Sequence, residues 1–195
     1  MENKITKQEM SADDKKKVLA ESGIIIGAVL LLCYFFGWSY VWNTSYGAEV
    51  TVNGWNYIIV CFTQKFKGTG ALYGDIAVPF NYYAKYYTRV LSIMTVVSLG
   101  VLIVFIVLSA FNIKKFHAKL EKVTIIVLYA LAVVYLGCII TALTMNGSKI
   151  LPKYCGGNPQ CSIATLAFFP FFITLITAIV HSVFVYKNKE EQAEE

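Results

Sequence analysis

The stretch VLSIMTVVSLGVLIVFIVLSAF, from Val90 to Phe111, decides the fold class because it contains no Asp, Glu, Lys or Arg. At a rise of 1.5 Å per residue, a helix of this length covers the hydrocarbon core of a bilayer, which is about 30 Å thick. In hydrocarbon, a single segment satisfies its own backbone hydrogen bonds only as a helix. We therefore predict a transmembrane helix over 90–111.

Three other stretches share this property and lie at 23–42, 123–145 and 163–186. The 195 residues are 57% hydrophobic and only 15% charged, which excludes a soluble enzyme and a disordered regulator. The stretches are apolar all round, so a β-barrel with alternating strands is excluded as well. The sequence predicts an all-α membrane protein, a bundle of four transmembrane helices with a small extracellular β-hairpin, whose membrane domain covers 23–186.

Positive charge predicts the orientation. The leader (1–22), the connection between the second and third stretches, and the tail (187–195) hold eleven Lys and Arg residues, against six on the other side. The positive-inside rule then places both termini in the cytoplasm of a multi-pass cell-membrane protein. The net charge of +5 reflects this topology, so no nucleic-acid partner is expected. The first stretch is longer than the apolar core of a signal peptide, which favours an uncleaved anchor.

The first outer loop, 43–89, contains a hairpin signal. Two runs rich in β-forming residues, 49–52 and 55–62, flank Asn53-Gly54, a pair typical of tight hairpin turns. We therefore predict a small hairpin above the membrane. An isolated hairpin is marginal in water, so it should pack on the rest of the loop, on the second outer loop (146–162) or on a partner.

Aromatic residues cluster immediately before the second stretch. They are Phe80, Tyr82, Tyr83, Tyr86 and Tyr87. One interpretation is an interfacial belt, with rings at headgroup level and hydroxyls in water. The other is an adhesive face for a partner, in which Trp55 and Tyr57 of the hairpin join these five rings.

The chain has five cysteines. Cys155 and Cys161 are separated by a Gly- and Pro-rich turn that allows a disulfide on the oxidising side of the membrane. Cys33 and Cys138 fall in apolar stretches, where reduced packing residues are expected. Cys61 is the odd outer thiol, which is free, paired with one of the other two, or bonded to another chain.

No catalytic residues, metal site or cofactor are predicted. The chain has only two histidines, His117 and His181, and no phosphate-binding loop or serine elbow. His181 has no acid near it in sequence, so we interpret it as a packing or interfacial residue instead of a proton relay. Pro170 should kink the fourth helix.

Gly54-Trp55 followed by Cys61 is similar to the Gly-Leu-Trp-x-x-Cys signature of claudin and peripheral-myelin-type tetraspan proteins. The Leu is missing, the spacing to the cysteine differs, and the second cysteine of that loop is absent. The order of four helices, a long first outer loop and a shorter second one also resembles that family. The resemblance implies a protein that works by lateral contact.

The expected function is therefore that of a non-catalytic integral membrane protein, an accessory or regulatory subunit or an adhesion component. Its expected partners are the lipid bilayer and a membrane protein or further copies of itself. Two alternatives remain open at this stage. One is a four-helix thiol oxidoreductase that uses outer cysteines and a quinone, and the other is a small channel or transporter subunit.

Overall fold

The structure is a computed structural model that describes residues 12–43, 48–63, 85–114, 118–147, 159–163 and 167–194. Long helices dominate it, together with one short helix and three short strands. In chain order these elements are α1 (Ala12–Cys33), β1 (Gly37–Asn43), β2 (Ala48–Asn53), α2 (Gly54–Thr63), α4 (Lys85–Lys114), α5 (Ala118–Gly147), β3 (Pro159–Ile163) and α6 (Phe168–Glu194).

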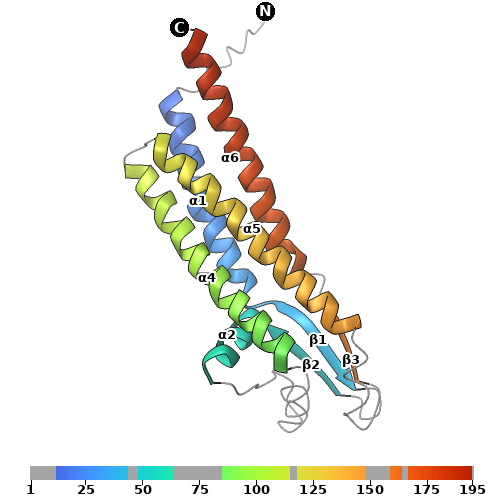
Figure 1. Cartoon of the computed structure of the whole chain (residues 1–195). Helices are drawn as coiled ribbons and strands as arrows, with labels where there is room; N and C mark the ends of the chain where they lie inside the picture. Colours follow the sequence, from blue (N-terminus) through green and yellow to red (C-terminus); the bar gives the residue numbers. More distant parts are fainter. Residues whose placement is uncertain are drawn as a thin grey trace, which may run out of the picture.

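The long helices pack side by side as an elongated bundle (Figure 1). Helix α4 contacts α1 and α5, and α6 contacts α5 and α1. The start of α1 and the end of α6 lie at one end of the bundle, while the strands and α2 lie at the other (Figure 1). We call these the terminal end and the sheet end.

Three of these helices are long and apolar enough to cross a membrane. The qualifying segments are Arg89–Ile113 in α4, Lys119–Thr144 in α5 and Phe168–Lys187 in α6. They contain most of the predicted stretches 90–111, 123–145 and 163–186, and they indicate a multi-pass membrane protein. Residue 163 itself belongs to β3, so the last helix begins later than predicted.

The first predicted span, 23–42, is not a single helix. Helix α1 ends at Cys33, where the amides of Tyr34, Phe35 and Phe36 each donate to the carbonyl three residues earlier. Such tight bonds are common in the last turn of a helix. The apolar run then continues as strand β1. An apolar run alone does not separate a helix from a buried strand, which is why the prediction was wrong here.

The predicted second hairpin strand, 55–62, is also wrong, because these residues form α2. The side-chain Oδ1 of Asn53 accepts a hydrogen bond from the Asn56 amide at 2.9 Å, which makes Asn53 the N-cap of that helix. The Trp55 amide donates to the carbonyl of Tyr34 at 3.3 Å. Asn53-Gly54 therefore starts a helix instead of turning a hairpin.

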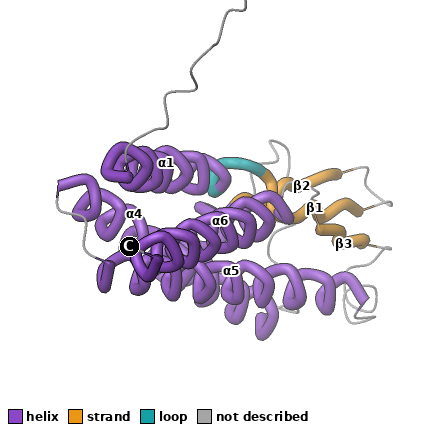
Figure 2. The backbone as a smooth tube through the Cα atoms, turned by 90° about the horizontal axis from the view of Figure 1, so that it is seen from above, coloured by secondary structure: helices purple, strands orange, loops and turns teal. Residues whose placement is uncertain are grey.

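The strands form one antiparallel sheet in the order β2-β1-β3 (Figure 2). Val41 in β1 pairs with Val50 in β2 on one side and with Cys161 in β3 on the other. The middle strand is thus supplied by the segment that follows α1, and β3 comes from the segment that precedes α6. The sheet joins the segment between α1 and α4 to the segment between α5 and α6.

Close approach of α1 and α4 depends on two glycines one turn apart. A methyl group at Gly27 would collide with the side chain of Ile106, and one at Gly23 would lie 2.6 Å from Ser109 Oγ. Small residues of this kind let membrane helices pack closely. The buried core beside this seam includes Leu30, Leu102, Phe105, Leu128, Leu131 and Ala178.

Pro170 does not kink the last helix. It lies in the first turn of α6, where its missing amide hydrogen is not needed, because the first amides of a helix have no partner within it. Its carbonyl accepts a hydrogen bond from Thr174 Oγ1 at 2.6 Å.

Candidate functional site

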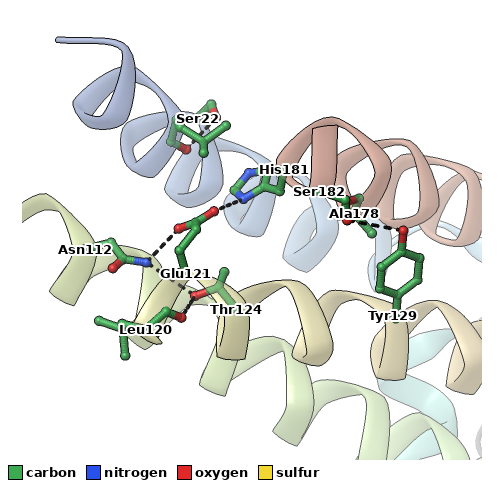
Figure 3. A network of polar contacts seen from close by, with 10 residues as sticks. Ser22, Asn112, Leu120, Glu121, Thr124, Tyr129, Ala178, His181 and Ser182 are labelled. Carbon is green, nitrogen blue, oxygen red and sulfur yellow. Dashed lines mark hydrogen bonds and ion pairs between the residues drawn. The ribbon is translucent and has the colours of Figure 1, made fainter. Parts of the chain in front are cut away.

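Two buried polar clusters and one exposed apolar surface are the features of the described residues from which a function can be argued. The first cluster lies near the terminal end of the bundle and we call it the Glu121 cluster. It consists of Glu121 and Thr124 on α5, Asn112 on α4 and His181 on α6 (Figure 3). All four residues are at most 3% exposed.

Short contacts hold the Glu121 cluster together. His181 Nδ1 lies 2.8 Å from Glu121 Oε1, and Asn112 Nδ2 donates to Glu121 Oε2 at 3.1 Å (Figure 3). The same Nδ2 lies 3.3 Å from Thr124 Oγ1, whose own hydrogen goes to the carbonyl of Leu120 at 3.0 Å. The Glu121 carboxyl group therefore links α4, α5 and α6.

Sequence reasoning missed this pairing. Glu121 and His181 are 60 positions apart, and Glu121 lies in the lysine-rich segment that was predicted to connect the second and third stretches. The structure instead places Glu121 inside the candidate span Lys119–Thr144 and His181 inside Phe168–Lys187. An ionisable residue inside a membrane span is costly unless it is paired, and it marks a candidate functional site.

The second cluster lies closer to the sheet end, and we call it the Tyr34 cluster. The hydroxyl of Tyr34 lies 2.6 Å from Ser98 Oγ and 3.4 Å from the hydroxyl of Tyr135. Ser98 Oγ donates its hydrogen to the carbonyl of Thr95 at 2.8 Å. Ser98 must therefore accept from Tyr34, and Tyr34 from Tyr135, so a one-directional chain of neutral hydroxyls links α5, the end of α1, and α4.

The exposed surface lies around α2 at the sheet end. Phe62 is 74% exposed and Ile59 50%, on the outer side of α2, while Phe35 and Phe36 after α1 are 64% and 52% exposed. The Trp55 ring lies 5.5 Å from the Phe35 ring, measured between centroids, which places α2 beside the end of α1. We call these four exposed side chains the α2 surface.

The predicted partner-binding residues do not form one surface among the described residues. Trp55 is half-buried between the rings of Tyr34 and Phe35, and Tyr57 is fully buried in the core. Phe80, Tyr82 and Tyr83 lie outside the described residues. Tyr86 and Tyr87 belong to the first turns of α4, but their side chains are not described.

No disulfide is formed by the cysteines whose side chains the structure describes, Cys33, Cys61 and Cys138. Cys61 lies on α2 as a half-buried thiol that forms no disulfide within the described part of the chain. The predicted Cys155–Cys161 bridge falls outside it, because Cys155 is not described and only the backbone of Cys161, in β3, is placed. Among the described residues, no group of three His, Cys, Asp or Glu side chains is arranged to hold a metal ion.

Comparison of the chain with models of known protein families finds no match, and comparison with curated proteins finds none either. The site must therefore be interpreted from its own chemistry.

Proposed function

We propose that the protein is a non-catalytic subunit of a larger membrane assembly, which it regulates or supports through the α2 surface. The observation that carries this proposal is α2 itself. It is a ten-residue helix, too short to cross a bilayer, yet it exposes large apolar side chains at the sheet end. Large apolar side chains exposed on a helix that does not cross the bilayer are typical of interaction sites.

The anchoring of α2 supports a rigid presentation of this surface. Tyr57 on its inner side is fully buried, its N-terminus is capped by Asn53, and the Trp55 amide is bonded to the end of α1. A preformed surface loses little conformational freedom on binding, which favours affinity. The partner suited to it is a second membrane protein that offers an apolar face at the same depth.

Within this proposal, α1 is a fourth membrane-embedded helix and both termini are cytoplasmic. Gly23 and Gly27 face Ser109 and Ile106, which lie within the α4 span, so the apolar half of α1 runs alongside that span. The excess of Lys and Arg at the terminal end supports the orientation. The claudin-like interpretation belongs to the same proposal, supported by the order of the long helices and by the short strands between α1 and α4.

The test is the recovery of a partner from mild detergent with Phe62→Ala, compared with Phe111→Ala as a matched control. Both rings are more than half exposed. Phe111, however, lies near the end of α4 that is far from α2 and the sheet. The wild-type chain and Phe111→Ala should co-purify with a stoichiometric membrane protein, identified by mass spectrometry, whereas Phe62→Ala should lose it.

Folded yield, followed by size-exclusion chromatography, should be equal for the two variants. A wild-type chain that purifies alone at its monomer mass would contradict the proposal. So would equal partner recovery by both variants, because lipid alone would then account for the exposed rings. A native mass that is a multiple of the chain and falls only in Phe62→Ala would identify the partner as a further copy.

A further inference from the structure

We infer that Glu121 and His181 form a proton-binding site inside the membrane bundle, which holds one proton more than a separate carboxylate and neutral imidazole would hold. The inference is independent of the α2 surface and of any partner. It rests on the hydrogen bonds and the burial of the Glu121 cluster.

The contacts limit where hydrogens can be. Glu121 Oε2 accepts from Asn112 Nδ2, so the ionised oxygen has a donor on that side. The 2.8 Å contact between Oε1 and His181 Nδ1 holds one hydrogen, which is bonded to either atom. A further hydrogen fits best on His181 Nε2, which makes none of these contacts, because a hydrogen on Oε2 would have to share that oxygen with the Asn112 donor.

Charge decides whether Nε2 carries that hydrogen. Without it, the pair is a carboxylate beside a neutral imidazole and has a net charge of −1 among side chains at most 3% exposed. With it, the pair is either an ion pair or two neutral groups, and in both cases its net charge is zero. Burying an uncompensated charge costs far more than burying a neutral, hydrogen-bonded pair.

No other described charged side chain is placed to neutralise the negative charge of the Glu121–His181 pair. The described charged side chains at the terminal end of the neighbouring helices are all exposed: Lys17 and Glu21 on α1, Lys119 and Lys122 on α5, and Lys187 on α6. On α4, the side chain of Lys114 is not described. Within the described part of the chain, the only ion-pair contact of Glu121 is with His181.

The cluster also offers acceptors for an Nε2 hydrogen. Nε2 itself is buried and has no hydrogen-bond partner among the described residues, and neither do Asn112 Oδ1 and Ser109 Oγ. These two oxygens belong to residues one turn apart on α4, at the same end of the bundle as His181. Both can accept a hydrogen, directly after a side-chain rotation or through an internal water.

The test counts hydrogens on the imidazole by ¹⁵N-histidine NMR of the full chain in lipid nanodiscs. His117→Gln serves as the background, because it leaves His181 as the only histidine. We expect Nε2 to carry a hydrogen from about pH 5 to about pH 8, the range over which histidine ordinarily titrates. Adding Glu121→Gln should leave a ring with a single N–H at about pH 8.

An Nε2 without hydrogen at about pH 8 in the Glu121 protein would overturn the inference. So would a doubly protonated ring that persists in Glu121→Gln, because His181 would then hold its proton without the carboxylate. If Glu121→Gln does not fold, the measurement in the His117→Gln background still decides, since it already distinguishes the two forms of Nε2.

Discussion

The Glu121 cluster and the Tyr34 cluster are both buried between α4 and α5, but they satisfy their polar atoms in different ways. In the Tyr34 cluster each hydroxyl gives its hydrogen to the next oxygen, and the chain ends on the carbonyl of Thr95. In the Glu121 cluster one carboxyl oxygen accepts from Asn112 and the other shares a hydrogen with His181 Nδ1, while atoms such as His181 Nε2 have no described partner. Neutral hydroxyls form a closed arrangement at any physiological pH, whereas an ionisable pair depends on its proton count.

The largest expected effect comes from removing one member of the ionisable pair. His181→Leu should lower the free energy of unfolding by about 3–5 kcal/mol, because Glu121 would be left buried without its ionisable partner. Unfolding in mixed detergent micelles, followed by circular dichroism, measures the loss.

The double variant Glu121→Met with His181→Leu is the control, since it removes the charge together with its partner. It should recover much of the lost stability. A double variant as unstable as His181→Leu would mean that shape, and not charge, controls this end of the bundle.

A smaller effect is expected at the α1–α4 seam, which runs between the levels of the two clusters. Gly27→Leu should destabilise the fold by about 1–3 kcal/mol, because the new side chain meets Ile106. Gly100→Leu on the exposed side of α4 is the control, because no atom lies within 4 Å of its new Cβ. The same unfolding assay should separate the two, and equal losses would show that α1 does not pack at Gly27 as described.

The smallest effects belong to the Tyr34 cluster. Tyr34→Phe removes the hydroxyl that donates to Ser98 and accepts from Tyr135, so we expect a loss of about 1–2 kcal/mol. Tyr135→Phe removes only the first donor of the chain and should cost less than about 1 kcal/mol. Neither loss should change between about pH 5 and about pH 8, in contrast to substitutions of Glu121. A loss that varies with pH would place an ionised group beside Tyr34.

The sequence predicts the three apolar helices well because absence of charge over a full bilayer thickness leaves few alternatives. It does not predict the end of α1, because Tyr34, Phe35 and Phe36 continue the apolar run in a different backbone conformation. Asn53 is a second case. Asparagine before glycine suits both a tight turn and a helix cap, and only the surrounding packing of Trp55 and Tyr57 selects the cap.

The sequence did not predict the Glu121 cluster, for a related reason. Its residues come from α4, α5 and α6, so no local spacing connects them. One signal was available, since Glu121 is the only acid in the lysine-rich segment between Asn112 and Lys122. His181 is the only histidine in the last charge-free run, so this isolated acid could have been considered as its partner.

The place of β1 in the sheet has a consequence for the order in which the chain is made. Strand β1 is synthesised early and can pair at once with the nearby β2, but its other edge waits for β3, which follows after α4 and α5. Until then β1 presents unpaired backbone groups, and such an edge is a template for association with other chains. A nascent chain that stalls before Pro159 would therefore be prone to aggregate through β1, and completion of the segment between α5 and α6 would act as the closing step of assembly.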